Sequence, residues 1–225
     1  MKFTVEKIAS MPMFWRTLTP FESAFIGQQQ IGSVDEESGG PSEGWDLISE
    51  TAFMLATETL PDDQAFAVAK EKIARLDNVK NSPISSANRR VVYQLRDAIL
   101  SSIESFDQET RKWMPVVPGF AALRASEADL LCGDLLVEFK CVSRNFSPRD
   151  VRQVLLYSAI LAETGKDVSS FAILNPRMGC SIRAKLQDAS LQLSGRPWVD
   201  TRLEILSSIE SYSRIFVPNR FESPN

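Results

Sequence analysis

A twelve-residue stretch, Asp129-Leu-Leu-Cys-Gly-Asp-Leu-Leu-Val-Glu-Phe-Lys140, holds two short apolar runs separated by the pair Gly133-Asp134. A two-residue loop with glycine first is typical of a type II′ hairpin turn. If the residues that flank this turn pair with one another, counting outward places Asp129 opposite Glu138. Opposed residues in a hairpin have Cβ atoms roughly 5 Å apart on one face of the sheet. The stretch therefore predicts two carboxylates close enough to share a divalent ion.

Lys140 lies two residues beyond Glu138, so it faces the same way on an extended strand. Asp134 is the rival aspartate, but four residues of strand rise put it roughly 13 Å from Glu138, and it is interpreted as a turn residue. The alternative for the three charged groups is an ordinary exposed hairpin face. Apolar residues on both faces instead predict a sheet covered on both sides, where these charges are costly unless they bind something. We favour Mg²⁺ or Mn²⁺, which take oxygen ligands.

Composition narrows the chemistry. The chain has 225 residues, 44% of them hydrophobic and 24% charged, and no histidine. Its length and composition predict one soluble globular domain. The missing histidine excludes Ser-His-Asp and Cys-His nucleophiles, histidine-ligated zinc and nucleases with a histidine base. The three cysteines predict buried thiols. Charged residues near the N-terminus and no run of about 20 apolar residues predict a cytoplasmic protein without a membrane partner.

Charge is unevenly placed along the chain. Residues 1–137 hold 13 basic and 20 acidic side chains, whereas residues 138–225 hold 12 basic and 9 acidic ones. The positive excess lies beside the hairpin, where it favours a polyanionic partner. Four arginines surround the expected site in sequence and could contact phosphates, solvated surface positions being the alternative for each: Arg144, Arg149, Arg152 and Arg177.

Periodicity and turn signals predict the order of elements. Helices are expected at 45–58, 62–76, 85–106, 147–164 and 198–212, strands at 120–125, 127–132, 135–142 and 170–175, and an acidic flexible loop near 32–44. Residues 84–225 thus predict an α-β-β-β-α-β core, a mixed sheet flanked by helices, followed by a C-terminal helix. Residues 1–83 are expected to form a mainly helical N-terminal extension.

This order, with Asp129, then Glu138-Phe139-Lys140, then Gln153-Val-Leu-Leu-Tyr157 on the following helix, resembles the PD-(D/E)XK nuclease superfamily and its RecB-like branch. The triplet Asn175-Pro176-Arg177 after the fourth strand looks like that branch too. The resemblance covers roughly residues 85–180. It implies a restriction-endonuclease-like core and a metal-dependent nuclease. An E-x-K triplet alone is common, so the specificity rests on the combination.

The chemistry gives each residue a role. Asp129 and Glu138 would bind the ion, and Lys140 would orient or help to deprotonate the attacking water, with a pKa that falls if it is buried. The resemblance adds the backbone carbonyl of Phe139 as a metal ligand and an extra acidic residue, Glu104. It also implies that a further pair, Gln153 and Tyr157, orients Lys140, the water or the nucleic acid. The alternative is a core tyrosine beside a solvated glutamine.

The expected function is metal-dependent hydrolysis of phosphodiester bonds, with DNA preferred to RNA as substrate. The resemblance places such an enzyme in prokaryotic or phage genome defence or DNA processing. Two alternatives stay open. One is a nuclease-like binding or assembly module that is inactive alone and activated by a partner, with the acidic N-terminal residues as docking surface. The other is an RNA-directed nuclease. A protein partner or a homo-oligomer is compatible with either.

Overall fold

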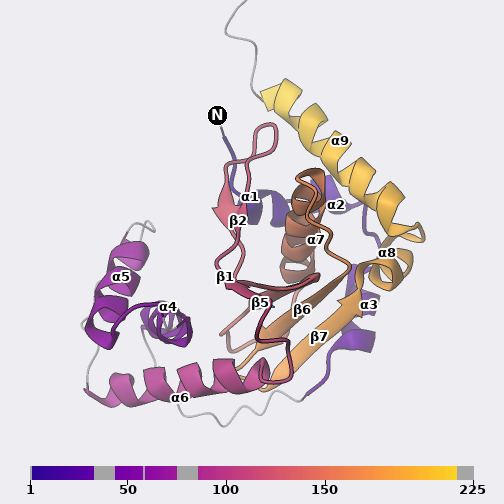
Figure 1. The fold of residues 1–225 in the computed structure, drawn as a ribbon. Coiled ribbons are helices and arrows are strands. Elements are labelled where there is room, and N and C mark those ends of the chain that lie inside the picture. Colours follow the sequence, from indigo (N-terminus) through magenta and orange to yellow (C-terminus); the bar gives the residue numbers. More distant parts are fainter. Residues whose placement is uncertain (1, 33–43, 58, 75–85, 217–225) are drawn as a thin grey trace, which may run out of the picture.

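The computed structural model describes residues 2–32, 44–57, 59–74 and 86–216, and Figure 1 shows a central sheet with helices on both sides. The sheet has the order β1-β4-β5-β6-β7, with bounds Arg111–Trp113, Leu130–Cys132, Leu135–Phe139, Ser170–Asn175 and Cys180–Lys185. β5 and β6 run parallel and the other neighbours antiparallel. The expected α/β class with a mixed sheet and flanking helices is confirmed.

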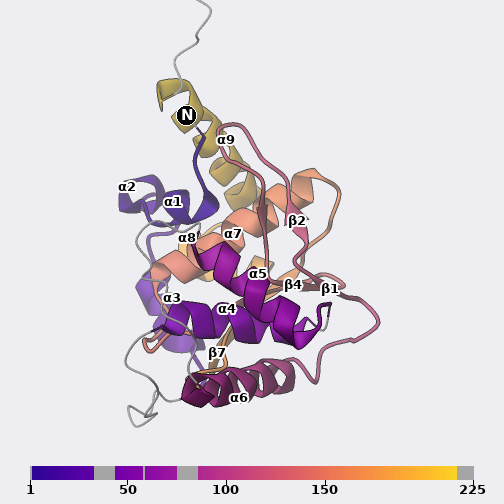
Figure 2. The same cartoon turned by 90° about the vertical axis from the view of Figure 1, so that its left-hand side faces the viewer.

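Two layers of helix cover the sheet (Figures 1 and 2). α4 (Trp45–Ala56), α5 (Asp62–Ala74) and α6 (Ser86–Ser102) share one apolar cluster with Leu135, Val137 and Phe139 of β5. α7 (Pro148–Glu163) shares the other cluster with Leu136. Alternate residues of β5 therefore point into different layers, as the two-residue repeat of a strand requires.

The remaining helices complete the α7 side of the sheet. They are α1 (Val5–Ala9), α2 (Pro12–Trp15), α3 (Glu22–Gln29), α8 (Leu186–Ser194) and α9 (Trp198–Phe216). Helices from the expected extension, residues 1–83, thus contribute to both apolar clusters. Nearly all of the expected loop at 32–44 lies outside the described residues. No helix in the described part of the chain is both long and apolar enough to cross a bilayer.

The strand expected at 120–125 is wrong. This segment forms a turn in which Ala121 has a φ of 49°. Gly119 packs so closely here that a Cβ at that position would lie 2.9 Å from the Leu123 carbonyl oxygen. Leu123 makes only an isolated bridge with Phe3. The neighbours in sequence form instead a two-stranded ribbon of β2 (Val116–Val117) and β3 (Ser126–Glu127).

The hairpin that fixes the site forms in the expected register for three pairs, from Cys132 opposite Leu135 to Leu130 opposite Val137. Gly133 has a φ of 58°, whereas Asp134 is not among the described residues with positive φ. Positive φ at the first turn position alone is the type II′ pattern. Asp134 is an exposed turn residue whose carboxylate accepts a hydrogen bond from Ser169, as its interpretation as a turn residue predicts.

Candidate active site

Asp129 ends the hairpin without forming the fourth backbone pair. The ladder stops at Leu130 and Val137, and the expected ladder pair of Asp129 with Glu138 is not formed. The Asp129 carboxylate instead accepts a hydrogen bond from the backbone N–H of Phe139 at 2.7 Å. A side-chain acceptor thereby replaces the missing backbone partner. This contact fixes one carboxylate oxygen beside β5, which carries Glu138 and is followed directly by Lys140.

Glu138 is almost completely buried, with 4% of its surface exposed. Its Oε1 accepts hydrogen bonds from Lys140 Nζ at 2.7 Å and from Gln153 Nε2 at 2.9 Å. Its Oε2 is buried and has no hydrogen-bond partner among the described residues. A buried carboxylate oxygen without a donor is costly, so this atom is the strongest sign that the site holds a further group.

Lys140 is held between two acceptors. Its Nζ donates to Glu138 Oε1 and, at 2.8 Å, to Gln153 Oε1. Burial works to lower the pKa of Lys140, but the charges of Glu138 and Asp129 outweigh burial, and the pKa is raised. The sequence had predicted a fall on burial, and the two carboxylates reverse it. Lys140 is therefore a fixed ammonium rather than a ready proton acceptor.

Gln153 and Tyr157 lie one turn apart on α7 and are both buried. The side-chain amide nitrogen of Gln153 donates hydrogen bonds to Glu138 and, at 3.2 Å, to the Tyr157 hydroxyl. The Tyr157 hydroxyl donates in turn to the backbone oxygen of Glu127 at 3.2 Å. The alternative of a solvated glutamine is wrong. The pair anchors Lys140 and Glu138 through a continuous chain of hydrogen bonds.

The helix that carries this pair begins with a second set of charged hydrogen bonds. Asp150 accepts from the backbone N–H and the hydroxyl of Ser147, both at 2.8 Å, and from Arg144 at 2.7 and 3.0 Å. Ser147 and Asp150 thereby occupy the N-cap and N3 positions of a capping box at the start of α7. Because α7 supplies Gln153, this cap helps to set the position of the active-site amide.

The site is short of positive charge. Burial and the charge of Glu138 raise the pKa of Asp129 to about 8, although Lys140 and the Phe139 N–H oppose them. Burial also raises the pKa of Glu138, against the effect of Lys140. Two desolvated carboxylates thus share one ammonium. A divalent cation would lower both pKa values, because opposite charge favours the ionised form.

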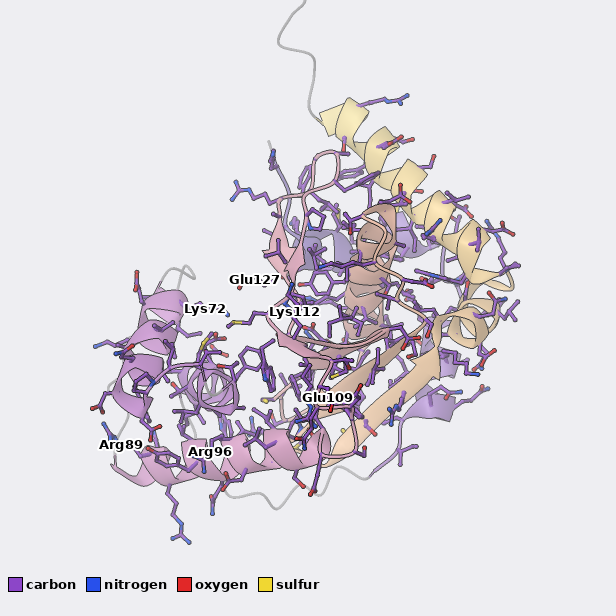
Figure 3. All side chains as sticks on the ribbon, in the orientation of Figure 1. Lys72, Arg89, Arg96, Glu109, Lys112 and Glu127 are labelled. Carbon is purple, nitrogen blue, oxygen red and sulfur yellow. The ribbon has the colours of Figure 1, made fainter. Side chains whose placement is uncertain are left out.

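A pocket of about 280 Å³ opens beside these groups. Asp129, Phe139 and Lys140 line it from the sheet, and α4 and α5 contribute Glu50, Phe53 and Lys72 among others. In the view of Figure 3, Lys72 extends from α5 toward the strands. Cys141 also lines the pocket, but burial and the charge of Asp129 raise its pKa to about 12, so its thiol stays protonated near neutral pH.

Glu50 is the acidic residue that the sequence did not predict. It lines the same pocket as Asp129 and Lys140, its carboxylate lies 2.7 Å from Lys72 Nζ, and its charge adds to the rise in the pKa of Asp129. Glu104, the expected extra acid, is exposed beyond the end of α6 and does not line the pocket. The one available signal was a carboxylate in the middle of a helix whose other residues are mostly apolar.

The four expected phosphate-contacting arginines have different surroundings. Arg152 forms an ion pair with the buried Glu22 at 2.7 Å, and its side chain is 12% exposed. Its guanidinium therefore links α7 to α3. Arg144 binds Asp150 yet stays 46% exposed. Arg149 is exposed. Arg177 stacks on Trp45 at the edge of a second pocket.

The donor set suits a hard divalent cation. Within the described residues no group of three or more His, Cys, Asp or Glu side chains forms a metal-ligating cluster. Mg²⁺ and Mn²⁺ do not require one, because they bind through one or two carboxylates and keep several waters. Asp129, whose pKa the charge of Glu138 raises, and the partnerless Glu138 Oε2 would supply those two oxygens. The fit therefore rests on two protein carboxylates with water and substrate completing the shell.

Comparisons with protein-family models, curated proteins and solved structures give no match to this chain.

Proposed function

We propose that this chain is a metal-dependent nuclease of the PD-(D/E)XK type with a restriction-endonuclease-like core. The observation that carries the proposal is the buried Glu138 carboxylate, which holds Lys140 and Gln153 on one oxygen and leaves the other without a partner. A structural salt bridge satisfies its buried oxygens. An oxygen left open beside a second carboxylate instead supports a bound cation.

Each side chain then has a distinct task. Asp129 and Glu138 would hold one Mg²⁺ or Mn²⁺, which supplies Lewis-acid activation of water and phosphate when bound. Lys140 presents a protonated amine that neutralises charge developing on the phosphate under attack. Its raised pKa makes it an orienting and electrostatic group rather than the general base. Gln153 keeps Lys140 and Glu138 in register, and Tyr157 fixes the amide of Gln153.

DNA is the proposed substrate and genome defence or DNA processing the proposed setting, both on the strength of the sequence resemblance. The experiment is a substrate panel. Linear, circular and single-stranded DNA and RNA are incubated with the full chain in Mg²⁺ or Mn²⁺ and, separately, in EDTA. Asp129→Ala and Lys140→Ala are run beside Lys185→Ala, which removes an exposed lysine from β7.

We expect cleavage of DNA that EDTA abolishes and that both site variants reduce by about 100-fold or more, while Lys185→Ala cleaves normally. Cleavage of RNA alone would move the proposal to an RNA-directed nuclease. No metal-dependent cleavage of any substrate by the wild-type chain would contradict the enzyme and favour a binding module. Unchanged cleavage by both site variants would contradict the site assignment.

A further inference from the structure

A second pocket lies next to the active-site pocket and has different chemistry. Its volume is about 550 Å³, and its walls include Trp45 and Ser49 of α4, Ser143 and Arg144 after β5, and Arg177 after β6. We call it the Trp45–Arg177 pocket. Its size falls in the range of about 300–1,000 Å³ that is common for small-molecule sites. Its lining combines cationic, hydroxyl and aromatic groups with one carboxylate, that of Asp46.

The two pockets are adjacent, because four residues line both of them. Asp46, Ser49, Cys141 and Val142 line both of them. Cys141 and Val142 directly follow Lys140 in the chain, so the loop after β5 leads from the catalytic lysine into the second pocket. A polymer whose phosphate lies at Lys140 can therefore place its next unit in the Trp45–Arg177 pocket.

Arg177 and Trp45 form a stacked pair at this pocket. The guanidinium carbon of Arg177 lies 3.4 Å from the centre of the Trp45 ring, which is a close cation–π stack. Its Nε is buried without a hydrogen-bond partner among the described residues. No carboxylate appears among the causes of its pKa shift, which burial directs downward. The guanidinium thus offers a flat cationic surface backed by the Trp45 ring.

Arg144 adds a second cation at the same pocket. It is bound to Asp150 but about half exposed, so part of its guanidinium stays accessible. Asp46 and Ser49 add acceptors and a hydroxyl. Bare phosphate would need only the cations, whereas a nucleotide uses a flat stacking surface, a cation and acceptors for base amines together.

We propose that the Trp45–Arg177 pocket binds one nucleotide next to the phosphate under attack, with its base stacked on the Arg177–Trp45 pair and its phosphate at Arg144. This inference rests on the proposed function for its substrate class. It assigns a substrate-binding role to Trp45 and Ser49, which lie outside residues 85–180, the part of the chain that carries the nuclease-like motifs. It also gives Arg177 a stacking role in place of simple charge attraction.

The test is binding without metal, so that it does not depend on cleavage. The full chain in EDTA is titrated with dAMP and with 2-deoxyribose 5-phosphate, which lacks the base, and affinities are measured by calorimetry. Variants are Arg177→Gln, Arg177→Lys and, as control, Arg183→Gln, which removes an exposed arginine stacked on Phe106 instead. Thermal melts check that each variant is folded.

We expect dAMP to bind the wild-type chain more tightly than the sugar phosphate. Arg177→Gln should weaken dAMP by about tenfold, and Arg183→Gln should not change it. Arg177→Lys should weaken dAMP but not the sugar phosphate, because lysine keeps the charge and loses the plane. Equal affinity for dAMP and the sugar phosphate, equal dAMP affinity of the Gln variants, or no dAMP binding by the wild-type chain would overturn the inference.

The outcome is separable from that of the proposed function. Binding at Arg177 with no cleavage of any substrate would keep the nucleotide site and reject the nuclease. Cleavage that Arg177→Gln leaves unchanged in KM would keep the nuclease and reject the site. If both hold, Arg177→Gln should raise KM by about tenfold with kcat unchanged, because the base contact is made equally in ground and transition states.

Discussion

Gln153 Oε1 accepts a hydrogen bond from Lys140 Nζ at 2.8 Å. This bond links the end of a strand in the central sheet to the helix that covers the sheet. Lys140 follows β5 and Gln153 lies in the second turn of α7. The same amide donates from its nitrogen to Glu138 and Tyr157. Both ends of one buried amide are therefore occupied, so the amide has a single orientation and Lys140 has a single position.

The first prediction concerns this amide. Gln153→Ala leaves Lys140 and Glu138 each without one partner, and we expect a loss of about 10–100-fold in kcat. Tyr157→Phe removes only the group that orients the amide and should cost about tenfold or less. Because both act through one chain of hydrogen bonds, the double variant should be no slower than Gln153→Ala alone. Single-turnover cleavage rates measure all three.

Tyr93→Phe is the control for that cycle, since the Tyr93 hydroxyl bonds Asp62 on α5, outside this chain of hydrogen bonds. It should cleave at the wild-type rate. Losses for Gln153→Ala and Tyr157→Phe that multiply in the double variant would show that the two residues act separately, and the shared positioning role would be wrong.

The second prediction is a gain in stability from a site substitution. Asp129 has a folded-state pKa of about 8, above its ordinary value of 3.8. Between these values the folded protein keeps a proton that the unfolded chain has lost, so rising pH destabilises the fold. Asp129→Asn removes this penalty and keeps an acceptor for the Phe139 N–H. Melting temperatures in EDTA should rise by several degrees, with about 2–4 °C for each kcal/mol.

The pH dependence is the sharper part of that prediction. The difference between Asp129→Asn and wild type should grow from about pH 4 to about pH 8 and then level off. Mg²⁺ should stabilise the wild-type chain more than the variant. Asp134→Asn, which alters the exposed turn aspartate, should show no such growth with pH. A difference that shrinks as pH rises would contradict the electrostatic description of the site.

The third prediction separates two glutamates. Glu50 lines the active-site pocket and Glu104 does not. Glu50→Gln removes negative charge that acts on Asp129, so the Mg²⁺ concentration for half-maximal cleavage should rise by about tenfold. Glu104→Gln should leave it unchanged. Metal titrations of the cleavage rate measure both. The reverse result would restore Glu104 as the extra acid and remove Glu50 from the site.

The hairpin and α7 could be predicted because their signals are local. Gly133 supplies the positive φ of the turn, and Ser147, Pro148 and Asp150 mark the helix start. β1 and β7 were missed for different reasons. Arg-Lys-Trp is too short to show a period, whereas Cys-Ser-Ile-Arg-Ala-Lys alternates apolar and polar residues, an edge-strand signal that was overlooked. The expected strand at 120–125 was wrong because close backbone packing at Gly119 favours a turn.

The site residues likewise fall into those that local sequence could predict and those that it could not. Asp129, Glu138, Lys140, Gln153 and Tyr157 lie within thirty residues of one another, so spacing could relate them. Glu50 and Trp45 reach their pockets only through the packing of α4 against the sheet, a contact between distant parts of the chain. The raised pKa of Lys140 could not be predicted from the sequence either, because it depends on the positions of the Glu138 and Asp129 carboxylates.

The fourth prediction concerns the helix that carries Gln153. Burial works to raise the pKa of Asp150, but hydrogen bonds from Arg144 and Ser147 outweigh it and hold that pKa below its ordinary value. Asp150 therefore stabilises the fold above about pH 4, and this contribution is lost as pH falls through the lowered pKa. Asp150→Ala should cost about 1–2 kcal/mol at pH 7, similar to loss of a helix cap.

Chemical denaturation between pH 3 and 7 measures this contribution. The gap between Asp150→Ala and wild type should narrow below about pH 4. Asp188→Ala, which alters an exposed aspartate in the first turn of α8, should show a smaller loss. A gap of equal size across the whole range would mean that Asp150 acts through packing rather than through its charge.

The proposed metal site is tested most directly by the cleavage rate of one DNA substrate in Mg²⁺ by wild type, Glu138→Gln and Glu163→Gln. Both substitutions remove the charge of a glutamate and keep its size. Glu138 is buried in the site, whereas Glu163 is exposed at the end of α7. We predict that EDTA stops wild-type cleavage, that Glu138→Gln is slower by about 100-fold or more, and that Glu163→Gln matches wild type. Cleavage by Glu138→Gln at the wild-type rate, or in EDTA, would contradict the metal site.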